Sequence, residues 1–250
     1  MKLVYVVRSV LASALFILNT VIFGSMAVIG SLFTSNVKFG NWILSTWSGI
    51  TAWSFNIKTH VRGEENLNEH GHIIVFNHSS HFDIVVILAG IKKTLRFGAK
   101  IELYSIPIFG RAMRAVGTLP ITRGDREKVL NLYNESISKV KNGMSFCLAA
   151  EGTRQPKPGV GEKFKAGPFI FAISGHLPVL PIVLCGVSEI LPKGRLLACT
   201  DKWRHDAYID VLRPISTDGL NEDDRRRLQD ETREKMVNSY QVLEQSLNRA

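Results

Sequence analysis

The most conspicuous feature of the hydrophobic pattern is a long apolar segment near the start of the chain. Between Val10 and Phe33 there are 24 residues without a charge, interrupted only by scattered Asn, Ser and Thr. A helix of that length can cross the hydrocarbon core of a bilayer. The run is longer than the core of a signal peptide and no convincing cleavage site follows it, so we expect the mature protein to retain it.

A second, amphipathic segment runs from Asn41 to Phe55. Apolar residues recur in it at helical spacing, and it holds three of the four tryptophans of the chain, Trp42, Trp47 and Trp53. Because tryptophan is typical of the headgroup level of a membrane, the segment predicts an interfacial helix. The alternative is that these tryptophans pack on the rest of the protein. The pattern also leaves open whether the first helix crosses the bilayer or returns with the second.

The remainder of the chain alternates short apolar, β-branched runs with helical stretches. Strands are expected at 56–62, 72–77, 94–99, 117–121, 145–150, 179–184, 195–200 and 206–212. Helices are expected at 125–141 and 221–247. This alternation predicts an α/β fold with a mostly parallel central sheet flanked by helices, whose strand carboxyl ends gather the site residues. We therefore divide the chain into membrane-anchoring helices, residues 1–56, and a main domain, residues 57–250.

The charge distribution indicates an anionic partner. Lys and Arg total 31 against 22 Asp and Glu, which gives a net charge of +9. No acidic residue precedes Glu64, whereas basic residues bracket the apolar segments, as expected at an anionic membrane surface. Nucleic-acid-binding motifs are absent from the sequence, so no nucleic-acid partner is expected.

The three cysteines, Cys147, Cys185 and Cys199, lie in apolar runs. An odd number of cysteines in such positions favours reduced thiols in the core, in a domain that faces a reducing compartment. Four of the seven histidines lie close together in the sequence, with irregular spacing: His70, His72, His78 and His81. With no Cys-x-x-Cys pair in the chain, we expect no metal site.

The strongest chemical signal is the segment Asn77-His78-Ser79-Ser80-His81-Phe82-Asp83, which follows the apolar run 73–76. Within one helix, side chains five positions apart diverge by about 140°. Across a strand-to-helix turn, however, His78 and Asp83 can meet. The aspartate would then orient the imidazole, whose other nitrogen could accept a proton as a general base. Ser79 and Ser80 lack the Gly-x-Ser-x-Gly context of a serine nucleophile.

Three further segments lie beside predicted strand ends or inside a strand: Gly117-Thr118-Leu119-Pro120-Ile121-Thr122-Arg123, Glu151-Gly152-Thr153-Arg154 and Leu177-Pro178-Val179-Leu180-Pro181-Ile182. Together with the His78 segment, these four blocks resemble those of the glycerolipid acyltransferase family over roughly residues 70 to 190. Ala150 and Pro120 depart from the family pattern, which usually has proline and an aromatic or apolar residue there. Neither departure removes a reacting group, so they bear on the choice of acceptor.

The resemblance implies His78 and Asp83 as catalytic residues. It also implies an acceptor-binding set made of Lys100, Arg123, Glu151, Gly152, Thr153 and Arg154. Arginine binds phosphate oxygens bidentately and keeps its charge, which fits a phosphate-bearing acceptor.

The implied reaction moves a fatty acyl chain from acyl-ACP or acyl-CoA to the sn-2 hydroxyl of 1-acyl-sn-glycerol-3-phosphate (lysophosphatidic acid), forming phosphatidic acid in phospholipid biosynthesis. The partners are then membrane phospholipid and lysophosphatidic acid, with acyl carrier protein or coenzyme A as co-substrate and no cofactor. We expect an inner (cytoplasmic) membrane location with the catalytic domain on the cytoplasmic side, and the resemblance favours a helix pair in one leaflet. The alternatives are another lysolipid acceptor, such as an aminolipid, and a non-catalytic lipid-binding protein.

Overall fold

The central sheet of the protein is mostly parallel and lies between two layers of helices, as the alternation of elements predicts. The computed structural model describes residues 2–122 and 124–248. Within these residues the sheet has seven strands in the order β1-β7-β6-β2-β5-β3-β4. The strands are β1 (Ile57–Arg62), β2 (Ile73–Phe76), β3 (Leu95–Lys100), β4 (Leu119–Ile121), β5 (Ser145–Ala149), β6 (Val179–Cys185) and β7 (His205–Val211).

The five strands from β6 to β4 in this order run parallel to one another, while β7 pairs antiparallel with β6 and parallel with β1. The carboxyl ends of β2, β3, β4 and β5 therefore meet at one edge of the sheet. The helices are α1 (Lys2–Ser31), α2 (Val37–Ser54), α3 (Asp83–Gly90), α4 (Phe109–Ala115), α5 (Arg126–Lys141), α6 (Gly167–Gly175), α7 (Val187–Ile190) and α8 (Arg225–Asn248). Short 3-10 turns are η1 (Glu64–Asn66), η2 (Ile101–Ser105) and η3 (Glu222–Asp224).

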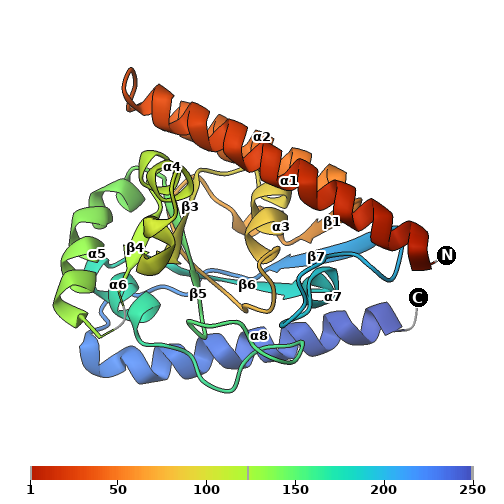
Figure 1. Ribbon diagram of the computed structural model, residues 1–250. Helices are drawn as coiled ribbons and strands as arrows, with labels where there is room; N and C mark the ends of the chain where they lie inside the picture. Colours follow the sequence, from red (N-terminus) through yellow and green to blue (C-terminus); the bar gives the residue numbers. More distant parts are fainter. Residues whose placement is uncertain (1, 123, 249–250) are drawn as a thin grey trace.

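Alternate side chains of the buried strands enter two separate cores. In β2, Ile74 and Phe76 join the core beneath α1, α2 and α3, whereas Ile73 and Val75 join the core beneath α5, α6 and α8. All four residues of β2 are buried, which is expected for a central strand of a parallel sheet covered on both faces. Figure 1 shows α1 and α2 lying along one side of the molecule and α8 along the other.

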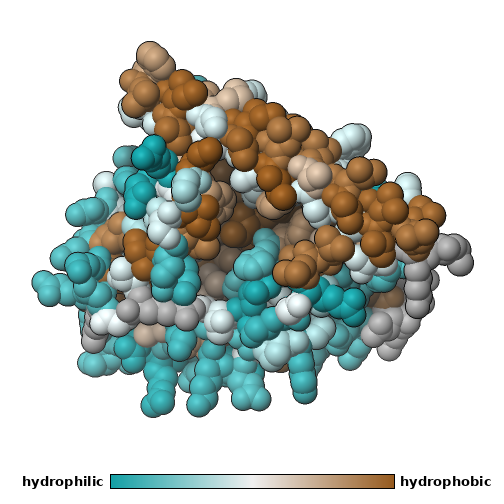
Figure 2. Space-filling view, in the orientation of Figure 1, coloured by the Kyte–Doolittle hydropathy of each residue, from teal (hydrophilic) through white to brown (hydrophobic). Residues whose placement is uncertain are grey.

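The helix α1 has its small and polar residues toward the protein and its large apolar residues outward. Ser9, Ala12, Asn19 and Ala27 are buried, while fourteen larger side chains of the same helix and the turn after it are exposed. These are Leu3, Val4, Val6, Val7, Val10, Leu11, Ile17, Leu18, Val21, Ile22, Met26, Ile29, Leu32 and Phe33. Among the described residues, α1 is the one helix long and apolar enough to cross a membrane by length and composition. Figure 2 shows a largely hydrophobic band along α1 on the face in view.

Hydrogen bonds hold α1 and α2 together as a hairpin. Asn19 donates to the carbonyl of Trp47 at 2.9 Å and to the hydroxyl of Thr51 at 3.1 Å, and the Trp47 indole donates to Thr20 at 3.0 Å. Such bonds join helices where the surroundings are as apolar as the helices themselves. Trp47 therefore packs within the protein, whereas Trp42 and Trp53 are exposed.

The expected strand at 195–200 is wrong, because the backbone of this segment bonds to α1 instead of to a strand. Arg8 of α1 donates to the carbonyls of Cys199, Lys202 and Trp203, and Ser9 donates to the carbonyl of Ala198. The other seven expected strands are present with boundaries shifted by at most two residues. The three cysteines are buried free thiols, as expected from their apolar runs.

The inward face of α1 leads to a prediction about Ala12, which is 5% exposed and belongs to the core beneath α2 and α3. Ala12→Leu should lower the free energy of unfolding by about 1–3 kcal/mol, because the added methyl groups have no space. The measurement is chemical unfolding in detergent. Ala14→Leu, on the exposed face of the same helix, is the matched control and should change it by less than about 0.5 kcal/mol. Equal effects of the two variants would contradict the docking of α1.

Candidate active site

The centre of the site is an ion-pair-like contact between His78 and Asp83. β2 ends at Phe76, and α3 begins at Asp83, so the two residues lie on either side of a strand-to-helix turn. The Nδ1 of His78 is 2.7 Å from Oδ2 of Asp83. The predicted meeting of the two side chains across the turn is confirmed. Nδ1 is engaged with the carboxylate, which leaves Nε2 as the nitrogen available for proton transfer.

Asp83 is buried, and its Oδ2 also accepts hydrogen bonds from the backbone N–H groups of Ser79 and Ser80 at 2.9 and 3.0 Å. The residue also lies in the first turn of α3, where the helix dipole favours a negative charge. Three donors and a helix terminus thus offset the cost of removing this carboxylate from water. Its other oxygen, Oδ1, is buried without a hydrogen-bond partner among the described residues.

Ser79 and Ser80 have structural roles. Both are nearly or fully buried, and the hydroxyl of Ser80 donates to the carbonyl of Leu191 at 3.2 Å. The backbone N–H of Phe82 in turn donates to the Ser80 hydroxyl. These bonds shape the turn that carries His78.

Glu151, which follows β5, holds the backbone of His78 in place. Its Oε2 accepts the N–H of His78 at 3.0 Å, and its Oε1 accepts the N–H of Gly161 at 3.0 Å. The carboxyl is 3% exposed, and burial raises its pKa while the backbone donors oppose that rise. On the other side, the N–H of Gln155 donates to the carbonyl of His78 at 2.8 Å. The segment 151–161 therefore forms hydrogen bonds with the peptide groups on both sides of His78.

Asn77 also fixes the end of β2, and our reading of the motif assigned it no role. Its side chain accepts the N–H of Leu184 at 2.7 Å and donates to the carbonyls of Leu184 and Gly159 at 2.9 and 3.1 Å. It thus joins β6 and the 151–161 segment to the strand end that carries His78. The available signal in the sequence was an asparagine directly after an apolar strand. Its side chain is fully buried in the structure, and a buried polar side chain needs hydrogen-bond partners.

The remaining acceptor-binding candidates lie at neighbouring strand ends. Lys100 is the last residue of β3, half-exposed, and its ammonium lies 3.0 Å from a carboxylate oxygen of Glu102. Gly152 has φ +65°, and Thr153 beside it is exposed. Arg154 is half-buried. The pKa of His81 is lowered mainly by the burial of His81 and, to a smaller extent, by the charge of Arg154. Arg154 is therefore close to the His78 turn. Arg123 lies outside the described residues.

Among the described residues, no three His, Cys, Asp or Glu side chains form a cluster that could hold a metal ion. The groups that the described part of the site offers for chemistry are the His78 imidazole, its buried carboxylate partner Asp83 and the nearby cation Arg154.

The comparisons with known proteins identify the family of this chain. A family model described as Acyltransferase matches residues 58–185, about half of the chain, and this match includes His78, Asp83 and the 151–154 block. The chain belongs to this acyltransferase family.

Among curated proteins, a chloroplast 1-acyl-sn-glycerol-3-phosphate acyltransferase of Brassica napus is 33% identical over 159 residues, which are 63% of this chain and 45% of that protein. The 1-acyl-sn-glycerol-3-phosphate acyltransferase of Saccharomyces cerevisiae is 26% identical over 246 residues, which are 97% of this chain and 79% of that protein. The chain spans less than half the length of the chloroplast relatives it matches.

The crystal structure of the 1-acyl-sn-glycerophosphate (LPA) acyltransferase PlsC from Thermotoga maritima has the same fold. Its TM-score is 0.80 at 24% sequence identity, and the alignment covers 98% of each chain. The likeness extends over α1 and α2 as well as the domain that carries the site.

The hydrogen bonds of Glu151 to the backbone of His78 and Gly161 lead to a prediction about Gly161. A Cβ added there would lie 2.5 Å from Cγ of Glu151, so the carboxyl that holds His78 would have to move. Gly161→Ala should therefore lower the free energy of unfolding by about 1–3 kcal/mol. Gly49→Ala is the matched control, because nothing lies within 4 Å of an added Cβ at this helical position. Gly49→Ala should raise the free energy of unfolding by about 0.5–1 kcal/mol, because alanine favours a helix over glycine. Thermal unfolding of both variants tests the prediction, and a stable Gly161→Ala protein would contradict it.

Proposed function

We propose that this protein transfers a fatty acyl chain from an acyl thioester to the sn-2 hydroxyl of 1-acyl-sn-glycerol-3-phosphate, forming phosphatidic acid. The observation that carries the proposal is the His78 imidazole, held by the buried Asp83 through Nδ1, in a member of the acyltransferase family. The names of the relatives from Brassica napus and Saccharomyces cerevisiae support this acceptor.

In the proposed reaction, Nε2 of His78 takes the proton of the sn-2 hydroxyl as its oxygen attacks the thioester carbonyl. A carbon–oxygen bond forms, and the carbon–sulfur bond breaks as the tetrahedral intermediate collapses. The proton on His78 then passes to the leaving thiolate. Asp83 keeps the imidazole in the orientation and tautomer that this sequence requires and stabilises the imidazolium that forms. No covalent enzyme intermediate, metal or redox cofactor takes part.

The acceptor phosphate would be bound by the cations at the strand ends. Arg154, near the His78 turn, is the best placed of those described, with Lys100 at the end of β3 as a further candidate. We assign Arg123 to the same group from its place in the second block. Gly152 and Thr153 would contribute backbone and hydroxyl groups to this acceptor site. Glu151 acts on substrate indirectly, as a positioning residue, because its carboxyl is occupied by the backbone of His78 and Gly161.

The membrane supplies the acceptor, and the exposed apolar surface is placed to receive it. Below the hydrophobic band of α1, Figure 2 shows a hollow surrounded on the α1 side by apolar groups. Leu103, Ile106 and Ile108 on the η2–α4 segment and Leu196 and Trp203 beside α7 are exposed apolar residues off the hairpin.

The α1–α2 hairpin should lie in one leaflet, not across the bilayer. Near its start, α1 is bonded to the 198–203 segment through Arg8 and Ser9. Near its other end, α1 packs on α4, where Ala27 and Ala112 share a small core. A helix that is bound near both ends to the same folded domain cannot carry one end to the far side of a membrane. The basic flanking residues and the reduced thiols support attachment to the cytoplasmic face of the inner membrane, with acyl-ACP or acyl-CoA as donor.

The activity is tested by thiol release from palmitoyl-coenzyme A, with and without lysophosphatidic acid, by the full chain in detergent. His78→Ala should lower acceptor-dependent turnover by ~10² or more, because the base is lost. Asp83→Asn should also lower it, by no more than His78→Ala does, because an amide does not select the imidazole tautomer in which Nδ1 carries the proton. His70→Ala, which removes an exposed imidazole outside the site, is the control and should retain wild-type turnover.

If wild-type protein releases no thiol, the same assay is repeated with acyl carrier protein thioester and a panel of lysolipids. Turnover with another lysolipid would replace the proposed acceptor. Absence of turnover with every donor and acceptor would contradict the enzyme assignment and favour a lipid-binding protein.

The phosphate assignment predicts a specific kinetic effect at Arg154. Arg154→Gln should raise the KM for lysophosphatidic acid by about 10- to 100-fold, the value of a charge-assisted hydrogen bond of about 1.5–3 kcal/mol. Lys157→Gln, an exposed cation on the same segment, is the matched control and should leave KM unchanged. An unchanged KM in Arg154→Gln, or the same rise in both variants, would contradict binding of phosphate by Arg154.

A further inference from the structure

A cavity of about 350 Å³ lies between α2 and the turn from α3 to β3, away from the site described above. It is at the carboxyl end of α3, whereas Asp83 is at the amino end of that helix. Its lining residues are Asn41, Trp42, Leu44, Ser45, Leu88, Ile91, Lys92, Lys93, Thr94, Leu95 and Arg96. Three of these are cations, and none of the described lining residues is acidic.

Arg96 is the unusual member of this set, because it is 3% exposed and has no carboxylate partner among the described residues. Its guanidinium donates to the side-chain oxygen of Asn41 and to the carbonyl of Leu95, both at 2.7 Å, and to the carbonyl of Val37 at 3.5 Å. Burial lowers the pKa of Arg96 to about 10, so it remains a cation at neutral pH. A buried cation surrounded only by neutral acceptors is costly, and an anion would offset that cost.

The backbone is shaped to admit this guanidinium. A Cβ added to Gly40 would lie 3.0 Å from Nη2 of Arg96, and one added to Gly117 would lie 3.4 Å from its Nε. Arg96 also lines a second cavity of about 250 Å³ beside the α1–α2 turn. The two glycines let the backbone approach the guanidinium closely, and two cavities adjoin a charge that has no carboxylate partner among the described residues.

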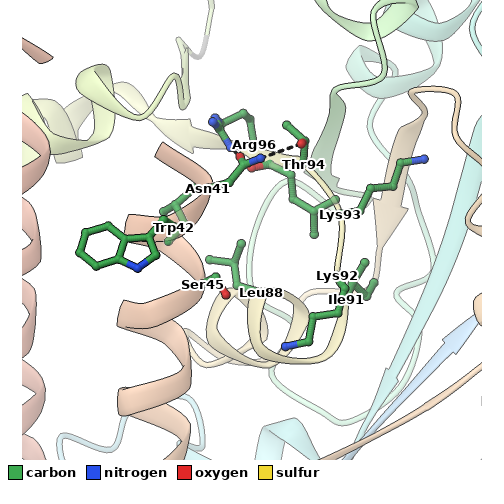
Figure 3. A pocket seen from close by; sticks show the side chains of 11 residues that line it. Asn41, Trp42, Ser45, Leu88, Ile91, Lys92, Lys93, Thr94 and Arg96 are labelled. Atoms are coloured by element: carbon green, nitrogen blue, oxygen red, sulfur yellow. Dashed lines mark hydrogen bonds between the residues drawn. The ribbon is translucent and has the colours of Figure 1, made fainter. Parts of the chain in front are cut away.

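Figure 3 shows the cations at different parts of the cavity. Lys92 lies at the end near Ser45, and Arg96 lies at the other end beside Asn41 and Thr94. Lys93 points away, since its ammonium donates to the carbonyls of Asn68 and His70. Lys92 is exposed, and its ammonium donates to the Ala89 carbonyl at 3.4 Å. Lys92 and Arg96 are thus the charges available to a ligand.

The cavity opens on the exposed stripe of α2, which differs from the exposed face of α1. The stripe consists of Lys38, Trp42, Ser45, Gly49 and Trp53, at helical spacing. A lysine and two tryptophans with small residues between them suit the headgroup level of a bilayer, whereas the aliphatic face of α1 suits the acyl chains.

We infer that this cavity binds the phosphate of an anionic membrane phospholipid, between Lys92 and Arg96, with Trp42 at its rim. The inference rests on the membrane association proposed above, but it concerns a second lipid site that takes no part in acyl transfer. A phospholipid is the occupant because the cavity opens beside exposed tryptophan on a helix of the membrane hairpin. The bound lipid would fix the catalytic domain to an anionic leaflet and hold α2 against α3.

The test measures binding of the full chain to vesicles of phosphatidylcholine alone and of phosphatidylcholine with phosphatidylglycerol. The quantity compared is the affinity for vesicles with phosphatidylglycerol divided by the affinity for vesicles of phosphatidylcholine alone. Ser45→Trp fills the cavity and should lower this ratio about fivefold. This is the contribution to binding of one basic residue at an anionic membrane surface. Gly49→Trp adds the same ring one turn away on the same stripe, with nothing within 4 Å of its Cβ, and should leave the ratio unchanged.

A second pair of variants separates the cavity from general surface charge. Lys92→Gln should lower the ratio more than Lys38→Gln, which removes an exposed cation of the same stripe outside the cavity. Equal ratios for Ser45→Trp and Gly49→Trp, or equal losses for the two lysine variants, would overturn the inference. Thermal stabilisation of wild type but not Ser45→Trp by inorganic phosphate alone would also overturn it, since the site would then bind free phosphate. None of these readouts depends on acyltransferase activity, so failure of the proposed reaction is distinguishable.

Discussion

The site depends on one buried contact, the bond between Asp83 and Nδ1 of His78. A carboxylate in the interior is stable only when donors replace the water it has lost. Here the imidazole and the N–H groups of Ser79 and Ser80 all converge on Oδ2, at the start of α3. This requirement fixes the conformation of the whole turn from Asn77 to Asp83. The same bond that satisfies Asp83 sets which imidazole nitrogen is free for chemistry.

The other parts of the fold keep this turn in place. Glu151 and Gln155 bond to the two peptide groups beside His78, and Asn77 joins the end of β2 to β6. These contacts come from neighbouring strands because the sheet is parallel where β2, β5 and β6 lie side by side. A hairpin of two helices then places an apolar face beside the catalytic domain. The arrangement suits the proposed reaction, whose acceptor and product would both reside in a membrane.

The sequence predicted the elements that depend on local pattern and missed those that depend on distant backbone partners. The meeting of His78 and Asp83 followed from the position of the motif between a strand and a helix. Glu151 was expected to bind substrate because the family resemblance assigns its block to the acceptor. Nothing in the sequence shows the contacts that the structure adds, in which its carboxyl accepts the N–H groups of His78 and Gly161. The apolar run at 195–200 looked like a strand, yet the side chains of Arg8 and Ser9 bond its carbonyls. Arg123, the remaining residue predicted to bind the acceptor, lies outside the described residues.

The central claim is that Asp83 keeps Nδ1 of His78 protonated, so that Nε2 is the base. Nitrogen-15 NMR of histidine-labelled protein in detergent tests it most directly, with His78→Gln identifying the signals of that ring. At a pH where the ring is neutral, the account predicts a protonated Nδ1 and an unprotonated Nε2, with the preference weakened in Asp83→Asn. A wild-type ring protonated at Nε2 and unprotonated at Nδ1 would contradict the account, because no free nitrogen would then face the acceptor hydroxyl.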